Sequence, residues 1–400
     1  MVERKIYMEK LLNYKDTEFV KVITGIRRCG KSTLLKFFVE YLLKEDKDVN
    51  LIYMNFESFE FDEIKDYREM YKKITDKIKN NRKAYIFLDE IQRVKEWEKC
   101  VNALMVDFDC DIYITGSNAY LLSSELSTYL SGRYVEINMF PLSFKEFLEF
   151  FSIEENLSLE DKFSQYIKFG GMPGIMPFKY KEDLYENTIK GVYYTVFIKD
   201  ILEKNKMTNA TLLEKVLKFI MNNIGSTLSS KKIADYLTSQ GNKVTHNTIL
   251  NYIEMLQNAY IIYKAQRYDI KGKNILKTLE KYYIVDTGIR NSVLGFRNDN
   301  IGYLIENIVY FQLVRLGYDV KIGKLTDLEV DFVATKHNDI KYYQVTMSML
   351  DENVRKRETE SLRKIRDNHE KIILTLDRVY SENLEDGIKC KNLIDFLMEE

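Results

Sequence analysis

A short stretch near the start of the chain combines glycines, a lysine and a hydroxyl residue at a spacing suited to phosphate binding. Residues 25–33 fit G-x-x-x-x-G-K-[ST], between a strand-like run ending at Ile23 and an amphipathic helix from Thr33. Glycines let consecutive N–H groups converge on phosphates, Lys31 reaches the outer oxygens, and the Ser32 hydroxyl ligates Mg²⁺. An accidental glycine turn is the alternative. We expect ATP and Mg²⁺ to bind at Gly25, Ile26, Arg27, Arg28, Cys29, Gly30, Lys31, Ser32 and Thr33.

Two carboxylates follow a second apolar run. Residues Ala84–Leu88 resemble a buried strand and lead directly into Asp89 and Glu90. In phosphate-loop enzymes the first carboxylate at such a strand end holds Mg²⁺ through water, and the second polarises the attacking water. Acidic pairs after apolar runs are common, so the assignment depends on the phosphate loop. We assign Asp89 to the metal, and Glu90 and Lys31 to catalysis, with Glu90 as the base.

A third strand ends in polar residues. Asp111–Thr115 runs into Gly116, Ser117 and Asn118. A polar side chain at the tip of a strand beside the other two orients the attacking water or senses the γ phosphate, so Asn118 and Ser117 are candidates, with Asn118 assigned to catalysis. The alternative is a loop whose polar residues cap the following helix.

An arginine and a glycine–proline turn complete a resemblance that covers Lys5 to about Lys204. Leu130–Arg133 precedes a predicted strand, and the chain here resembles AAA+ ATPases, whose arginine at this place faces the nucleotide of a neighbouring subunit. The resemblance implies a homo-oligomer with Arg133 as catalytic finger; an ordinary surface arginine is the alternative. Residues 169–174 resemble the turn that STAND-type and archaeal AAA-like ATPases place over the nucleotide base, which implies that Pro173 contacts the nucleotide. A plain helix–helix connection would also explain this turn.

Lysines concentrate between Ser229 and Lys281, where the pattern is helix, turn, helix and hairpin. A helix is predicted over Ser229–Ser239, a second from the N-cap Thr245 to Leu256, and strands over Ala259–Ala265 and Tyr282–Val285. This pattern matches a winged helix, a DNA-binding fold whose second helix enters the major groove while lysines of the wing meet phosphates. Packing against the ATPase core or a partner is the alternative. The outward side chains are expected to be Lys243, His246, Asn247 and Asn251.

The last quarter of the chain resembles the restriction-endonuclease-like fold. Its helix glutamate, strand aspartate and [E/Q]-x-K tripeptide, which bind Mg²⁺ and activate water, map onto Glu306, Asp331 and Gln344. Thr346 stands where the tripeptide requires lysine. We therefore expect a vestigial metal site without cleavage, unless Lys341 or Lys356 supplies the ammonium from a displaced position. Residues 329–334 are also explained by a plain alternating strand.

Composition is that of a soluble intracellular enzyme. The chain has 400 residues, of which 45% are hydrophobic and 30% charged, enough for two or three domains with cores. Its net charge of −1 excludes a protein that coats nucleic acid indiscriminately. No apolar run suits a membrane span or signal peptide, and the 4 cysteines have no C-x-x-C spacing, so we expect a cytoplasmic protein without membrane association, disulfides or zinc.

The order of these segments resembles a widespread family of archaeal and bacterial AAA-type ATPases. It implies an α/β P-loop core over 1–150 with strand order 5-1-4-3-2, a helical lid over 151–208, a winged helix over 209–298 and a C-terminal α/β domain over 299–400. We expect Mg²⁺-dependent ATP hydrolysis coupled to DNA or nucleoprotein remodelling. A nucleotide-gated switch acting through protein partners, and an ATP-regulated nuclease, are the alternatives.

Overall fold

The chain divides into two compact units in a computed structural model. One unit comprises Met1–Pro141 and Asn258–Tyr260, and the other comprises Leu142–Gln257 and Ile261–Glu400. The finer division into four domains stays a prediction; residues 152–156 and 206–208, next to two of its boundaries, lie outside the described residues. The structure describes residues 3–79, 82–122, 129–130, 132–151, 157–178, 182–205, 209–378 and 384–399.

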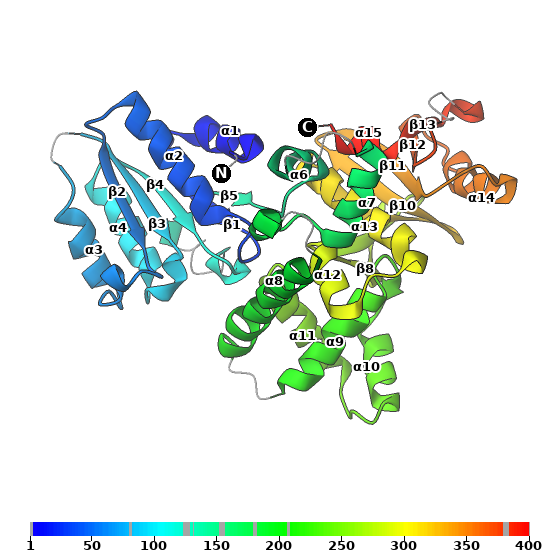
Figure 1. The fold of residues 1–400 in the computed structure, drawn as a ribbon, viewed down its shortest axis with the longest axis horizontal. Helices are drawn as coiled ribbons and strands as arrows, with labels where there is room; N and C mark the ends of the chain where they lie inside the picture. The colour runs from blue at the N-terminus through cyan, green and yellow to red at the C-terminus, as the bar shows by residue number, and fades with distance from the viewer. Residues whose placement is uncertain are drawn as a thin grey trace. The chain divides into compact units, whose positions relative to one another are not determined.

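The first unit is built on a parallel sheet of five strands (Figure 1). All neighbouring strands pair in parallel, in the order β2-β3-β4-β1-β5. Read from the other edge, this is the order 5-1-4-3-2, so the predicted α/β P-loop class is confirmed. Because the carboxyl ends of parallel strands share one edge, the ends of β1, β3 and β4 lie together. The strands are β1 (Val20–Thr24), β2 (Asn50–Asn55), β3 (Ala84–Asp89), β4 (Cys110–Thr115) and β5 (Tyr134–Asn138).

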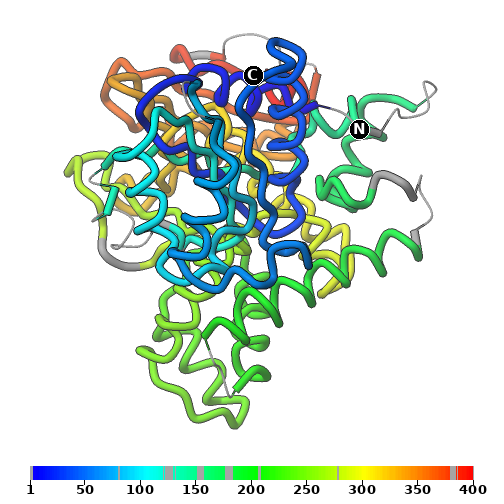
Figure 2. The backbone as a smooth tube through the Cα atoms, turned by 90° about the vertical axis from the view of Figure 1, so that its left-hand side faces the viewer, coloured from blue at the N-terminus to red at the C-terminus, as the bar shows by residue number. Residues whose placement is uncertain are grey.

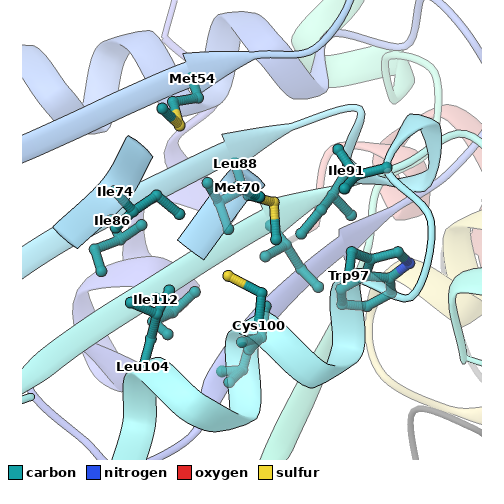
Figure 3. Packing of buried hydrophobic residues seen from close by; sticks show 14 of the residues in the cluster. Met54, Met70, Ile74, Ile86, Leu88, Ile91, Trp97, Cys100, Leu104 and Ile112 are labelled. Carbon is teal, nitrogen blue, oxygen red and sulfur yellow. The ribbon is translucent and has the colours of Figure 1, made fainter. Parts of the chain in front are cut away.

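Helices cover both faces of this sheet (Figures 1 and 2). On one face, Phe38 of α2 packs its ring against Phe87 and Tyr113. The other face carries the apolar cluster of Figure 3, in which side chains of α3 and α4, such as Met70 and Leu104, meet strand residues. The helices that connect the strands therefore pack on both faces of the sheet and fix the positions of the strand ends. The helices are α1 (Lys5–Tyr14), α2 (Lys31–Glu45), η1 (Phe59–Phe61), α3 (Tyr67–Thr75), η2 (Ile91–Arg93), α4 (Trp97–Asp107) and η3 (Ala119–Leu122).

The second unit begins with helices and continues into a mixed sheet. Its helical part contains a π-helix, η5, which directly follows α8. This part comprises α6 (Phe144–Phe151), α7 (Leu159–Phe169), η4 (Pro173–Phe178), α8 (Glu182–Thr195), η5 (Val196–Glu203), α9 (Ala210–Asn222), α10 (Ser230–Ser239), α11 (His246–Asn258) and α12 (Thr287–Leu294). The later helices are η6 (Asn298–Asn300), α13 (Ile301–Arg315), α14 (Glu352–Arg363), η7 (Glu385–Gly387) and α15 (Leu393–Leu397).

The sheet of the second unit has eight strands in the order β13-β12-β11-β10-β9-β7-β8-β6. The hairpin β7-β8 joins the later strands because β7 pairs in parallel with β9. The predicted wing and the predicted C-terminal domain therefore share one sheet. Its strands are β6 (Thr227–Leu228), β7 (Ile262–Asp269), β8 (Asn274–Ile284), β9 (Asp319–Leu325), β10 (Leu328–Lys336), β11 (Asp339–Thr346), β12 (Glu370–Thr375) and β13 (Lys389–Asn392).

Both strands of this hairpin differ from the sequence prediction. The predicted strand from Ala259 is wrong at its start, because β7 begins at Ile262 and Tyr260 has a φ of 55°. A left-handed backbone interrupts an extended strand, and periodicity does not reveal it. Strand β8 is longer than predicted, since it begins at Asn274 rather than Tyr282.

Candidate functional site

The loop between β1 and α2 has a backbone that requires its glycines. Gly25 has a φ of 134°, and a Cβ there would lie 2.1 Å from the carbonyl oxygen of Met139. Gly30, with a φ of 107°, caps α2, so the first N–H groups of that helix face the loop. Ile26 and Cys29 are buried, and Arg27 forms an ion pair with Glu57. The loop therefore offers mainly backbone N–H groups to an anion.

Lys31 lies under this loop with only 4% of its surface exposed. Its ammonium donates to the carbonyl oxygens of Gly25 at 2.9 Å and Ile26 at 3.2 Å. Both acceptors are neutral. Phosphate oxygens accept stronger, charge-assisted hydrogen bonds, so an incoming nucleotide can replace these contacts.

Asp89, at the end of β3, collects three hydroxyl groups. Its Oδ1 accepts from Ser32 Oγ at 2.9 Å and Thr115 Oγ1 at 2.5 Å, and its Oδ2 accepts from Tyr53 at 2.9 Å. Burial and the charge of Asp89 raise the pKa of the Tyr53 hydroxyl, which keeps it a donor. A hydroxyl and a carboxylate oxygen next to a phosphate loop are hard oxygen ligands of the kind that Mg²⁺ prefers. The pair Ser32 and Asp89 therefore fits Mg²⁺ held between protein and phosphates.

Glu90 follows Asp89 and turns the chain sharply. Its φ of 56° is left-handed, and its N–H donates to Thr115 Oγ1 at 3.0 Å. Its side chain accepts from Gln92 Nε2 at 2.5 Å. Gln92 and Thr115 are two site residues that the sequence analysis missed, and only their polar type beside a strand end signals them. Together they fix the backbone and the carboxylate of the predicted base.

Ser117 and Asn118 are buried in the loop after β4, with 0% and 2% of their surfaces exposed. Strand β4 lies between β3 and β1, so this loop follows the strand that separates Asp89 from the phosphate loop. The structure therefore brings Asn118 to the carboxyl edge of the sheet, and its role toward the γ phosphate stays a prediction.

Arg133 lies at the opposite edge of the same sheet. It precedes β5, and its guanidinium donates to Asn102 Oδ1 at 3.1 Å and to the Leu130 carbonyl at 3.3 Å. Five strand residues at about 3.3 Å each separate the two edges, so Arg133 lies roughly 15 Å from the phosphate loop of its own chain. A catalytic role for Arg133 therefore requires a second subunit.

The glycine–proline turn has a structural partner within the second unit. Asp286, the N-cap of α12, accepts from Gly171 N–H at 2.6 Å and Ile289 N–H at 3.0 Å. A Cβ at Gly170 would lie 2.3 Å from Asp286. Burial raises the pKa of Asp286 to about 6. Close packing of α7 on α12 thus explains the glycines, and a nucleotide contact of Pro173 stays a prediction.

The predicted DNA-contacting helix presents its polar residues to solvent. Lys243, His246, Asn247 and Asn251 are exposed, whereas Ile249, Ile253 and Leu256 of α11 are buried as one face. Lys271 and Lys273 are exposed in the turn between β7 and β8. Lys281 was counted in this basic stretch, and that is wrong, because only 3% of its surface is exposed.

Lys281 instead reaches the acidic residues of the predicted vestigial nuclease site. Its ammonium lies 3.1 Å from Glu306 and 2.7 Å from Glu329, and Tyr283 also donates to Glu306 at 2.7 Å. Burial by itself lowers the pKa of Lys281, but Glu306, Asp331 and Glu329 outweigh burial and raise it. The neighbouring carboxylates thus favour the charged ammonium of Lys281 within this cluster.

Asp331 and Gln344 form hydrogen bonds between the neighbouring strands β10 and β11. Asp331 accepts from Val345 N–H at 2.8 Å, and burial together with the charge of Glu306 raises its pKa well above the usual range. Gln344 accepts weakly from the Asp331 N–H and donates to Glu358 at 2.8 Å. Across the described part of the chain, no three or more His, Cys, Asp or Glu side chains are placed to hold one metal ion.

Neither lysine that the sequence suggested as a substitute is at this cluster. Lys341 pairs with Glu370 at 3.0 Å and Lys356 with Glu352 at 2.8 Å. No sequence pattern pointed to Lys281, because it lies in the basic stretch of the predicted winged helix, far along the chain from the nuclease-like pattern.

Comparisons with known proteins identify the family of this chain. An AAA domain model matches residues 17–148, and a model for a domain of unknown function matches residues 160–300. An uncharacterised protein of Haemophilus influenzae is 42% identical over 402 residues, covering 100% of this chain and 99% of that protein. An uncharacterised protein of Methanocaldococcus jannaschii is 33% identical over 336 residues, covering 80% of this chain and 73% of that protein. The chain belongs to their family. The AAA domain makes it a family of AAA-type P-loop ATPases.

A solved structure shows the same fold. The Walker-type ATPase of Pyrococcus abyssi matches with a TM-score of 0.51 and 17% identity, over 73% of this chain and 96% of that chain. Among the residues that the structure describes, no helix of this AAA-type family member is both long enough and apolar enough to cross a membrane.

Proposed function

We propose that the protein hydrolyses ATP with Mg²⁺ and couples hydrolysis to the remodelling of DNA or nucleoprotein. One observation carries the proposal. The Ser32 hydroxyl of the phosphate loop donates to Asp89 Oδ1 at 2.9 Å, and Glu90 is the next residue along the chain. A phosphate cradle, a metal-binding pair and a base thus meet at one edge of the sheet. These are the parts that phosphoryl transfer to water requires.

Each residue has a distinct task in this proposal. The loop N–H groups and Lys31 bind the phosphates, and Lys31 leaves the carbonyls of Gly25 and Ile26 to do so. Ser32 would hold Mg²⁺ directly and Asp89 would hold it through a water, and the ion would supply positive charge beside the phosphate oxygens. Glu90 takes a proton from the water that attacks the γ phosphorus, and the bond from that phosphorus to the ADP oxygen breaks. Asn118 orients this water.

The DNA part of the proposal is supported by the second unit. The order α9, β6, α10, α11, β7, β8 is that of a winged helix, and the exposed side chains of α11 include Lys243 and His246. Lys271 and Lys273 extend from the turn of the hairpin. The nuclease alternative is not favoured, because Thr346 stands where the tripeptide requires lysine and, among the described residues, no three acidic side chains are placed to hold one metal ion.

Steady-state ATP turnover, measured with and without duplex and single-stranded DNA, tests this function, with oligomer mass determined in parallel. We expect Mg²⁺-dependent turnover that DNA accelerates, in a homo-oligomer. Tight nucleotide binding without turnover would instead favour the nucleotide-gated switch. Turnover that no DNA changes would leave the ATPase and remove its coupling to DNA.

A further inference from the structure

Arg4 is a buried arginine next to the phosphate loop, and 5% of its surface is exposed. Its Nη1 donates to the carbonyl oxygens of Phe140 at 2.6 Å and Cys29 at 3.3 Å, and its Nη2 donates to Pro141 at 3.3 Å. The guanidinium also lies 4.6 Å from the centre of the Tyr7 ring. A buried guanidinium is costly unless its donors are satisfied, so these carbonyls fix its position.

Two of the three carbonyls belong to a segment that the sheet holds firmly. Met139, just before Phe140, donates its N–H to the Thr24 carbonyl at 2.8 Å, and Phe140 N–H donates to the Tyr7 hydroxyl at 3.0 Å. Arg4 is therefore anchored to the end of β5. The hydrogen bond from Arg4 to the Cys29 carbonyl ties the phosphate loop to that anchor.

The Cys29 contact sets the direction of a phosphate-binding group. No peptide bond among the described residues is cis, so the C=O and N–H of the peptide joining Cys29 and Gly30 point in opposite directions. Because Arg4 holds the Cys29 carbonyl, the Gly30 N–H is directed away from Arg4. Gly30 is the cap of α2, where N–H groups have no partner within the helix.

We propose that Arg4 is a positioning residue for nucleotide binding, which presents the Gly30 N–H to the phosphates by holding the Cys29 carbonyl. The inference rests on the proposed ATPase function, because it needs a nucleotide in the loop. Arg4 touches no phosphate itself. It acts on ground state and transition state alike, so it governs affinity rather than the chemical step.

The test compares Arg4→Met and Arg4→Lys with two control variants of the full chain. Lys5→Met removes a neighbouring exposed charge, and Tyr7→Phe removes the hydroxyl that Phe140 contacts while leaving the Cys29 contact in place. The measurements are kcat and KM for ATP, and the inhibition constant of pyrophosphate, a probe that has phosphates but no base. Thermal unfolding checks that each variant is folded.

We expect Arg4→Met to raise KM for ATP and the pyrophosphate inhibition constant by about tenfold each, with kcat within about twofold of the parent. Arg4→Lys, which retains the charge and can donate to one or two of the carbonyls, recovers part of the affinity. Lys5→Met stays at the parental values, and Tyr7→Phe, which loosens the Phe140 anchor but keeps the Cys29 contact, loses clearly less affinity than Arg4→Met. If Arg4→Met does not fold, Arg4→Lys decides, with a rise in KM of about threefold as the expected result.

Other results overturn the inference. Parental KM in Arg4→Met, a fall in kcat at unchanged KM, or an equal loss of affinity in Tyr7→Phe would each show that Arg4 does not act through the loop. In all three cases the parent still hydrolyses ATP, so the proposed function stands. A parent that binds no ATP would remove both.

Discussion

The two lysines at the centre of the candidate sites, Lys31 and Lys281, are equally buried but have different partners. Lys31 donates to neutral carbonyl oxygens, and Lys281 pairs with the carboxylates of Glu306 and Glu329. When phosphate arrives, Lys31 exchanges neutral hydrogen bonds for charge-assisted ones. If Lys281 moved, it would leave the largely buried carboxylate of Glu306 without its counter-charge. The first site is therefore ready for an anionic ligand, and the second already contains its own counter-ion.

The first prediction concerns Lys31 and the base beside it. Lys31→Ala should abolish ATP binding and hydrolysis. Glu90→Gln should keep ATP affinity and lower kcat by about 10²–10⁴-fold, the range that general-base catalysis contributes. Calorimetric titration with ATP and steady-state turnover measure the two effects. Lys36→Ala, an exposed lysine of the same helix, is the control. Parental turnover in Glu90→Gln would show that Glu90 is not the base.

The second prediction concerns Arg133, which lies too far from the phosphate loop of its own chain to act on a nucleotide there. Arg133→Ala should keep nucleotide affinity and lower kcat by about 10³-fold, since arginine fingers contribute at least this much. Turnover of the parent should rise more steeply than linearly with protein concentration. Mixing Arg133→Ala with Lys31→Ala should restore activity, because one subunit supplies the nucleotide and the other the arginine. A monomer whose specific activity is independent of concentration contradicts this role.

The third prediction removes the Lys281 ammonium from the second site. Lys281→Met should lower the free energy of unfolding of the second unit by about 3 kcal/mol, because the largely buried Glu306 loses its counter-charge, whereas the exposed Glu329 is screened by water and contributes little. Hydrogen exchange of α13 and β8 amides under increasing urea measures this loss. The control Lys356→Met removes an exposed ion pair on α14 and should cost about 0.5 kcal/mol or less. Equal costs for the two variants would mean that Lys281 is no more important than a surface lysine.

The fourth prediction concerns the exposed lysines just before α11 and in the turn between β7 and β8, which lie outside the acidic cluster around Lys281. Changing Lys243, Lys271 and Lys273 together to Glu should weaken duplex DNA binding and reduce the salt slope by up to about 3 units, close to one per lost phosphate contact. Fluorescence anisotropy at several salt concentrations measures the slope. The same change at the exposed Lys36, Lys44 and Lys47 of the first unit controls for net charge. An unchanged salt slope would show that these lysines do not contact DNA and would favour a protein partner for the second unit.

The last prediction is that the acidic cluster of the second unit does not cleave DNA. Protein with Mg²⁺ or Mn²⁺ should leave duplex, single-stranded and branched DNA intact, with or without ATP, because Thr346 stands where the tripeptide requires lysine and no three acidic side chains of the described residues are placed to hold one metal ion. Gel electrophoresis after long incubation is the measurement. Cleavage that Asp331→Ala abolishes would show that the second site is, like the first, open to a ligand.

The sequence by itself determined the first site to a large extent. Its residues lie in short contiguous motifs, and each motif follows a buried strand. Parallel strands place their carboxyl ends at one edge, so Lys31, Ser32, Asp89 and Glu90 were expected together before any contact was known. The requirement for glycine at positions 25 and 30 was also predictable from the motif, because few other residues tolerate a positive φ and such close backbone packing.

Only the tertiary structure decided which distant residues complete these sites. Arg4 meets carbonyls of residues 29, 140 and 141, and Lys281 meets Glu306 and Glu329. Alternation along a strand indicates which face a side chain takes, but it does not specify the partner on another strand or helix. That choice depends on strand order and on the packing of helices against the sheet. For this reason a lysine that looked like part of a solvated wing is the buried counter-ion of the second site.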